Sequence, residues 1–320
     1  MIRPELQALR DDDRPQRQAQ ADLGQIHAAW RDSRLGSGLN HSLAAFASGE
    51  ALENLPPLAR LFAPGDGAAP RLAADFIGKF TGVLSANPWG QVPIPSKLDD
   101  VTATIVLAAA GNAALVLQAI DGEALRARPP AVSTGFSPGE THDHVLAGRG
   151  SGRLFELLAE NKGGAELRCT PCELSAGSIT RRDGARQALL IESAETTLVV
   201  LRLQRRPACG TVSREFRLAD GSLAHQATAN PKESRFELAA ALLGRMGRSD
   251  AAPLLAAMAE ERGGLSLRWQ ALKEGLGLDT AEGFAVLSRI ASRDYDELAA
   301  PARALRAQLI AAHPQLGRLG

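Results

Sequence analysis

The sequence has little cysteine, few aromatic residues, no excess of charge of either sign and no long apolar run. Three cysteines in 320 residues cannot form a disulfide framework. The 36 basic residues balance the 36 acidic ones, which disfavours a protein built mainly to hold nucleic acid. Aromatic residues make up 4% of the chain, too few to favour stacking on bases or sugars. No stretch approaches the roughly 20 apolar residues that span a bilayer, so we expect no membrane partner.

The composition that remains is that of a folded globular protein. Hydrophobic residues reach 45%, too many for an intrinsically disordered chain. The first residues lack the apolar middle region and small-residue cleavage site of a secretory signal. We therefore expect a cytoplasmic protein. The abundance of Ala and Arg favours a bacterial source with a GC-rich genome.

Periodicity changes twice along the chain, so we expect an N-terminal helical segment, a central β-rich domain and a C-terminal helical domain. Their predicted bounds are 1–97, 98–229 and 230–320. In the first segment Leu72, Phe76 and Phe80 recur at helical spacing, whereas the glycines and serines of 34–40 predict a turn.

Short β-favouring runs fill the central segment, one about every 8–12 residues. Two apolar runs, 101–109 and 113–120, flank Gly111-Asn112, a pair that favours a hairpin. The clearest strand is 196–203. This pattern predicts an antiparallel sandwich or barrel. The expected fold class is α+β, with a β-sandwich between N-terminal helices and a C-terminal helical bundle or short α-solenoid.

Five helices with short connections are predicted in the C-terminal segment. Their expected bounds are Ser234–Met246, Ala251–Arg262, Leu267–Gly275, Ala281–Ala291 and Glu297–Ala312. Two connections, 247–250 and 277–280, end one helix with Gly and cap the next with Asp, Ser or Thr. Helix pairs repeating at about 30 residues resemble α-solenoids of the HEAT type.

The densest group of chemically versatile side chains is Glu140-Thr141-His142-Asp143-His144. Alternate residues of a strand point to one side, so His142 and His144 share a face in a strand and suit one metal ion there. The alternative is a solvated loop beside Pro138-Gly139.

A strand-rich domain with His-x-His after a glycine resembles the cupin family. The first cupin motif runs Gly, five residues, His-x-His, three or four residues, Glu, six residues, Gly. Here Gly135 lies seven residues before His142, and Gly139 lies three before it. Gly148 and Arg149 stand where the family has its Glu.

The resemblance implies a small β-barrel that holds iron, manganese, nickel or zinc, or one that binds its ligand without metal. By this resemblance the metal ligands are His142, His144 and His225, with Glu140 or Glu156 as the carboxylate. Cupin-like sheets often pair through edge strands, so the resemblance also implies a homodimer.

Cys169 and Cys172 form a Cys-x-x-Cys sequence, which serves as a redox pair or as half of a zinc site in other proteins. A zinc site that combined them with His142 and His144 would have the required ligand types. The alternative is two partly buried small residues. No partner is evident for Cys209.

Paired arginines near strand ends, such as Arg181-Arg182, suit bidentate recognition of a carboxylate or phosphate. The alternative is a solvated strand edge. In the C-terminal helices, Arg268 and Trp269 form a candidate partner-binding anchor, or Trp269 packs in the core.

These observations favour a non-catalytic ligand-binding or regulatory protein, which holds a small molecule or contacts a protein partner. The first alternative is a metal-dependent cupin-type oxygenase or isomerase. The second is a nucleic-acid-binding regulator, which would need its arginines gathered on one face.

Overall fold

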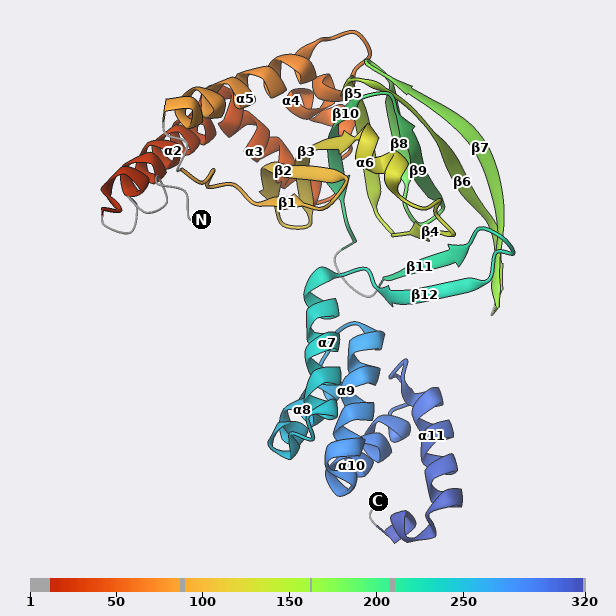
Figure 1. Ribbon diagram of the computed structural model, residues 1–320. Coiled ribbons are helices and arrows are strands. Elements are labelled where there is room, and N and C mark those ends of the chain that lie inside the picture. Colours follow the sequence, from red (N-terminus) through yellow and green to blue (C-terminus); the bar gives the residue numbers. More distant parts are fainter. Residues whose placement is uncertain (1–11, 87–89, 162, 208–210, 319–320) are drawn as a thin grey trace. The chain divides into compact units, whose positions relative to one another are not determined.

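A computed structural model describes residues 12–86, 90–161, 163–207 and 211–318. Helices precede and follow a set of antiparallel strands along the chain, which confirms the predicted α+β class (Figure 1).

Contacts divide the chain into two compact units. The first consists of Met1–Thr134, Gly139–Arg206 and Arg217–Gly221, and the second of Gly135–Pro138, Pro207–Phe216 and Ser222–Gly320. The N-terminal helices therefore belong to the same unit as the large sheet. The division into segments 1–97, 98–229 and 230–320 stays a prediction.

The first unit begins with short and long helices. They are α2 (Arg14–Asp32), α3 (Arg34–Ala47), η1 (Leu52–Asn54), α4 (Pro56–Ala59), η2 (Arg60–Phe62) and α5 (Ala68–Ala86). The turn predicted over 34–40 is wrong, because the chain is helical there. The Ser33 hydroxyl accepts a hydrogen bond from the Gly36 N–H at 3.1 Å and caps the start of α3.

A six-stranded antiparallel sheet follows, in the order β1-β2-β3-β10-β5-β8. Its strands are β1 (Ser96–Leu98), β2 (Thr102–Ala110), β3 (Ala113–Asp121), β5 (Glu140–Ala147), β8 (Ile179–Asp183) and β10 (Thr197–Arg205), and the short helix α6 (Gly122–Ala127) follows β3. The predicted hairpin at Gly111-Asn112 is confirmed, since β2 pairs with β3. Gly111 has a φ of 54°, a conformation that its missing side chain makes accessible.

A three-stranded sheet in the order β7-β6-β9 packs on the large one. Its strands are β6 (Arg149–Asn161), β7 (Gly164–Ser175) and β9 (Gln187–Ala194). Val145, Leu198 and Val200 of the large sheet form one buried cluster with Leu174 and Ala194 of the small sheet. The two sheets therefore form the predicted sandwich.

The other face of the large sheet is covered by the N-terminal helices (Figure 1). Leu115 and Leu117 of β3 and Leu201 of β10 share a buried cluster with Phe46 of α3. Side chains alternate between the two faces of a strand. Each residue of β5 and β10 therefore points either to the helices or to the interior of the sandwich.

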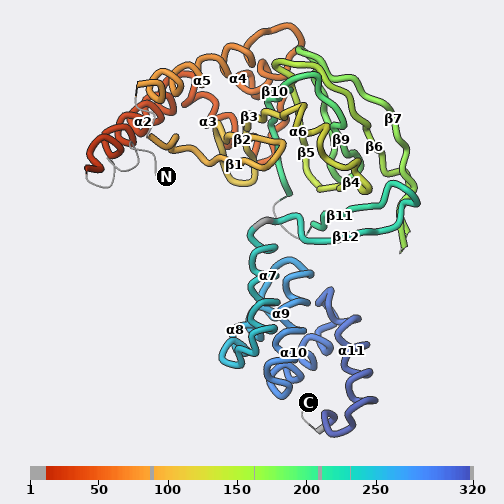
Figure 2. The backbone as a smooth tube through the Cα atoms, in the orientation of Figure 1, coloured from red at the N-terminus to blue at the C-terminus, as the bar shows by residue number. Residues whose placement is uncertain are grey.

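A small sheet in the order β12-β11-β4 is made of β4 (Ser133–Phe136), β11 (Val212–Arg217) and β12 (Leu223–Thr228). The C-terminal helices follow β12 in the chain (Figure 2). They are α7 (Pro231–Arg245), η3 (Ser249–Ala251), α8 (Ala252–Glu260), α9 (Leu265–Leu278), α10 (Thr280–Ser292), α11 (Ala299–Ala312) and η4 (Pro314–Arg318). The five predicted helices are confirmed. Their core includes Leu255, Leu272, Phe284, Leu287 and Ile290.

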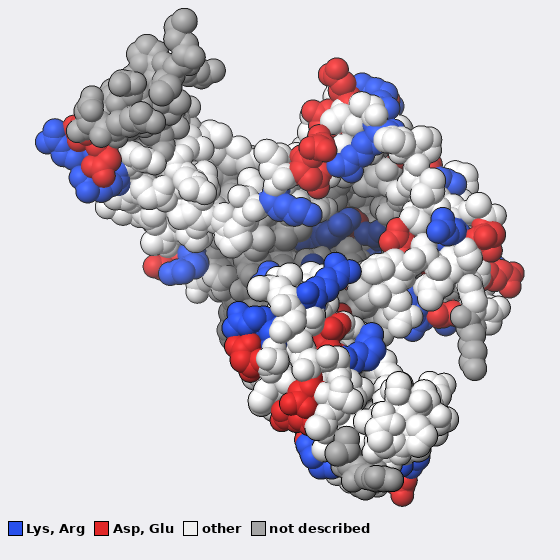
Figure 3. Space-filling model, turned by 60° about the horizontal axis from the view of Figure 1, so that its bottom comes forward, with Lys and Arg blue, Asp and Glu red and all other residues white. Residues whose placement is uncertain are grey.

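No helix in the described part of the chain combines the length and the apolar character that a bilayer crossing requires. Figure 3 shows basic and acidic side chains interspersed with uncharged ones over much of one face.

Candidate ligand site inside the sandwich

Strand β5 presents different side chains to its two faces. His142 and His144 are both buried and point to the N-terminal helices, where the Nδ1–H of His144 donates to the Leu61 carbonyl at 2.7 Å. Asp143 lies between them and points to the interior of the sandwich. The predicted strand and the shared face of the two histidines are confirmed, whereas the solvated loop is wrong. The shared face is the one under the helices, not the interior of the sandwich, where the resemblance implied a metal site.

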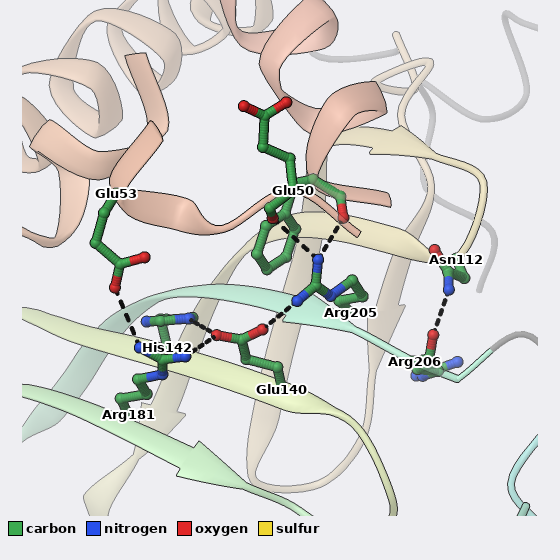
Figure 4. A network of polar contacts seen from close by, with 9 residues as sticks. Glu50, Glu53, Asn112, Glu140, His142, Arg181, Arg205 and Arg206 are labelled. Atoms are coloured by element: carbon green, nitrogen blue, oxygen red, sulfur yellow. Dashed lines mark hydrogen bonds and ion pairs between the residues drawn. The ribbon is translucent and has the colours of Figure 1, made fainter. Parts of the chain in front are cut away.

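On the helix side, the carboxylate of Glu140 gathers three donors (Figure 4). The Nε2–H of His142 donates to it at 2.8 Å. Arg181 and Arg205 bind the same carboxylate at 2.9 and 2.5 Å. Arg181 also pairs with Glu53 of η1 at 3.1 Å. This network therefore fastens the helical segment to the edge of the sheet.

Arg205 strengthens the same attachment. One of its nitrogens donates to the carbonyls of Phe46 at 2.7 Å and Glu50 at 3.1 Å, and its guanidinium lies 4.3 Å from the centre of the Phe46 ring (Figure 4). The ring of His142 packs against Phe46 and Phe62. These contacts are those of a structural junction between helices and sheet.

Burial and charge act in opposite directions on this network. Burial lowers the pKa of His142, and its hydrogen bond to Glu140 offsets only part of that effect. Burial alone would raise the pKa of Glu140, but His142, Arg181 and Arg205 together hold it below its usual value. At neutral pH the network thus contains a neutral imidazole beside an ionised carboxylate.

The interior face carries a second charged cluster, centred on Asp143. Arg202 of β10 binds the carboxylate with two nitrogens, at 2.6 and 2.9 Å. Arg182 of β8 donates to the same carboxylate from the other side. The side chains of Asp143 and Arg182 are 6% and 10% exposed, so this is a nearly dry ion cluster with two cations and one anion.

The cluster leaves hydrogen-bonding groups unused. The Nε–H of Arg182 and the hydroxyl of Thr180 are buried, and neither has a hydrogen-bond partner within the described part of the chain. Burial lowers the pKa of Arg182, the carboxylate of Asp143 raises it in part, and the second cation, Arg202, lowers it again. Arginine nevertheless stays charged at neutral pH, because its intrinsic pKa is so high.

The small sheet supplies Cys172 to this interior. Cys172 packs against the cluster that joins the two sheets. Cys169 lies three positions earlier on β7, so its side chain points to the opposite face, where it is exposed. The two thiols therefore do not form a redox pair or a shared metal site, which corrects that prediction. Cys209 lies outside the described residues.

The predicted metal ligands do not form one site. Glu156 binds Arg168 at 3.5 Å and accepts from Gln187 at 3.2 Å. His225 is exposed on β12, in the second unit, opposite Glu215 of β11. His142 donates to Glu140 on the helix side. Over the residues that the structure describes, no three His, Cys, Asp or Glu side chains are grouped as metal ligands. A metal of the kind implied by the cupin resemblance does not fit these residues.

The structure contradicts the predicted partner-binding anchor at Arg268, which is buried, and confirms the alternative for Trp269, which packs in the core of the C-terminal helices. Arg268 is buried, and it donates to the Ala259 carbonyl at 2.9 Å and to the Asp296 carboxylate at 2.6 Å. Trp269 packs against the core of the C-terminal helices.

The two side chains of the Arg181-Arg182 pair lie on opposite faces of β8. Arg181 points to the helices, and Arg182 points to the interior of the sandwich. The sequence-based interpretation named neither Asp143 nor Arg202 as a partner of Arg182, with which they form the interior cluster. The sequence holds a signal for Arg202 alone, which stands between Leu201 and Leu203 in the clearest predicted strand. Such a residue needs a buried counter-charge.

No family model matches the sequence, and no curated protein matches it either. Several solved cupin-fold proteins are similar to part of the chain. Vicilin from hazelnut, Corylus avellana, is 15% identical, with 39% of this chain and 33% of the vicilin chain covered and a TM-score of 0.27. The capsular polysaccharide assembling protein CapF from Staphylococcus aureus is 12% identical, with coverage of 47% and 40% and a TM-score of 0.27.

A putative mannose-6-phosphate isomerase from Ralstonia eutropha is 16% identical, with coverage of 36% and 93% and a TM-score of 0.24. The chain thus spans about a third of vicilin and two fifths of CapF. The fold class itself rests on the sheets and cores described above.

Proposed function

We propose that this protein is a non-catalytic binding protein whose sandwich interior holds a small oxyanion, a carboxylate or a phosphate. The observation that carries the proposal is the Arg182 Nε–H, which is buried beside Arg202 and Thr180 and has no partner within the described residues. A buried donor without a partner costs about 1–3 kcal/mol, which a ligand oxygen would recover.

The charge of the cluster favours an anion over a metal ion. Two guanidinium groups, Arg182 and Arg202, face one carboxylate, Asp143, which leaves an excess of one positive charge. A divalent cation would be repelled by both arginines, whereas an oxyanion would complete their pairing. The Arg202 side chain is 25% exposed, so the cluster is not sealed from solvent.

Calorimetric titration with succinate and with inorganic phosphate tests this function. We expect Arg182→Gln to weaken binding at least tenfold, because it removes a cation and the free Nε–H. The matched control is Arg181→Gln, one position along the same strand but facing the helices, and it should leave the affinity within about twofold. Failure of both anions to bind the native protein at millimolar concentration, or equal losses in the two variants, contradicts the proposal.

A metal-dependent enzyme predicts a different outcome. Elemental analysis of protein purified without a metal-affinity tag should then give near-stoichiometric iron, manganese, nickel or zinc, and chelator should lower the Tm. We expect neither, because His142 and His144 lie under the helices and not in the interior.

The rest of the sequence-based interpretation stays a set of predictions. It comprises a HEAT-type arrangement of the C-terminal helices, a homodimer, contact with a protein partner and a cytoplasmic location.

A further inference from the structure

A groove of about 690 Å³ lies among the N-terminal helices, apart from the sandwich interior. It is lined by α3, by the α4–η2 segment and by α5. Its apolar lining includes Leu35, Pro57, Leu61 and Leu72. Leu35 is 45% exposed, so its apolar surface is accessible to a ligand in the groove. The volume lies within the range of about 300–1,000 Å³ that small-molecule sites occupy.

Positive charge surrounds this apolar lining. Arg34, Arg60 and Arg71 all line the groove. Asp66 accepts from Arg60 at 3.0 Å and lies 3.6 Å from Arg71, so a single carboxylate holds two guanidinium groups in place.

The acidic side chains at the groove do not balance its arginines. Asp75 also lines the groove, but Lys79 neutralises it as an i,i+4 pair. Arg34 contributes one positive charge, and the Arg60–Asp66–Arg71 group contributes a second. The groove therefore has two positive charges in excess.

Gly38 of α3 gives the groove its depth. A Cβ added at this position would meet no atom within 4 Å, although the residue lies in the interior of a helix. The open space beside Gly38 therefore belongs to the groove. A larger side chain would occupy it without displacing the backbone.

We propose that this groove binds an amphipathic monoanion, a carboxylate with an extended hydrocarbon body. The body lies on the apolar lining beside Gly38, Leu61 and Leu72, and the carboxylate is recognised by Arg34 and Arg71 at the rim. This site is independent of the oxyanion site in the sandwich and has a different ligand class.

Three probes separate the contributions of the carboxylate and of the hydrocarbon body to binding: dodecanoate, dodecyltrimethylammonium and acetate. In calorimetric titrations below the micelle concentration, dodecanoate should bind at least tenfold more tightly than either of the others. Dodecyltrimethylammonium has the same hydrocarbon chain as dodecanoate, but the arginines repel its positive charge. Acetate has the same carboxylate but no hydrocarbon chain to bury.

Two substitutions locate the site. Gly38→Leu should weaken dodecanoate binding at least tenfold by filling the groove, and it should not unfold α3, since leucine favours a helix over glycine. The matched control is Gly24→Leu on α2, where an added Cβ also meets nothing within 4 Å but the residue does not line the groove. Arg34→Gln should weaken dodecanoate binding about fivefold and should not weaken dodecyltrimethylammonium binding, because it removes a positive charge that repels this cation.

Several results would overturn the proposal. They are equal binding of dodecanoate and dodecyltrimethylammonium, unchanged dodecanoate binding in the Gly38→Leu protein, or equal losses in the Gly38→Leu and Gly24→Leu proteins. Arg182→Gln should not change dodecanoate binding, so the two proposed sites fail or succeed separately.

Discussion

Adjacent residues of β5 contact different parts of the molecule, because a strand sends successive side chains to opposite faces. His142 and His144 pack under the helices, whereas Asp143 holds two arginines inside the sandwich. The same alternation separates Arg181 from Arg182. His142 and His144 share a face, as their spacing predicted, whereas the paired role predicted for Arg181 and Arg182 is wrong because they point to opposite faces.

Buried His142 should make the protein less stable below about pH 6.5. Its pKa is lowered in the folded state, so the unfolded chain, with the ordinary value of 6.5, binds a proton that the folded protein does not. Stability is therefore complete above pH 6.5 and falls as the pH drops toward the folded pKa. The loss is about 1.4 kcal/mol for each unit by which the pKa is lowered.

Urea unfolding at pH 7.5 and pH 5.5 measures this effect. His142→Gln keeps a donor for Glu140 but does not titrate, so its loss between the two pH values should be smaller than that of the native protein. His225→Gln, an exposed control, should behave like the native protein. His27 also has a pKa lowered by burial, and its contribution is common to all three proteins. Equal pH dependence in all three contradicts the assignment.

Arg268 is expected to be one of the most sensitive positions in the C-terminal helices. Its hydrogen bond lowers the pKa of Asp296, and both side chains are almost fully buried. Arg268→Ala leaves that carboxylate buried without its partner, which costs about 3–5 kcal/mol. Arg248→Ala breaks an exposed pair with Asp250 and should cost under about 1 kcal/mol. Urea denaturation of the two variants checks the contrast, and similar losses would contradict it.

At the scale of elements, two glycines of α3 have opposite roles. A Cβ at Gly36 would collide with the carbonyl oxygens of Trp30 and Arg31, so α3 starts close to the end of α2 only because this residue has no side chain. Gly38, half a turn further on, has open space. From the sequence, both glycines are interpreted as signs of a turn. The sequence alone does not reveal the Ser33 cap or the close approach of the two helices.

Alanine substitutions should therefore shift stability in opposite directions. Gly36→Ala should destabilise the protein by about 1–3 kcal/mol, because the backbone has to move. Gly38→Ala should stabilise it by up to about 1 kcal/mol, because alanine favours the helix. Chemical denaturation of both variants measures the difference, and a stabilised Gly36→Ala protein contradicts the proposed close approach.

Most of the elements could be predicted from local patterns. The Gly111-Asn112 hairpin, the strand that contains Val199–Leu203 and the five C-terminal helices follow from turn residues and periodicity. The pairing of β10 between β3 and β5 has no local signal, since it joins strands about 80 and 60 residues apart in sequence. That pairing is what brings Arg202 to Asp143, so the interior cluster could not be predicted.

At the scale of the whole molecule, the two compact units have separate cores. Differential scanning calorimetry of the full chain should therefore show two transitions, because each core unfolds on its own. Arg268→Ala should lower the Tm of one transition and Gly36→Ala the Tm of the other. A single transition that both substitutions shift equally contradicts two independent units.

The central claim is that the sandwich interior is charged to hold an oxyanion, and Asp143→Asn tests it most directly. This substitution removes the internal competitor of a ligand carboxylate and leaves Arg182 and Arg202 without a counter-ion. Calorimetric titration with succinate should show binding about tenfold tighter than in the native protein, with Asp100→Asn as the exposed control of equal charge. Unchanged or weaker succinate binding in the Asp143→Asn protein, or an equal gain in the control, would contradict the account.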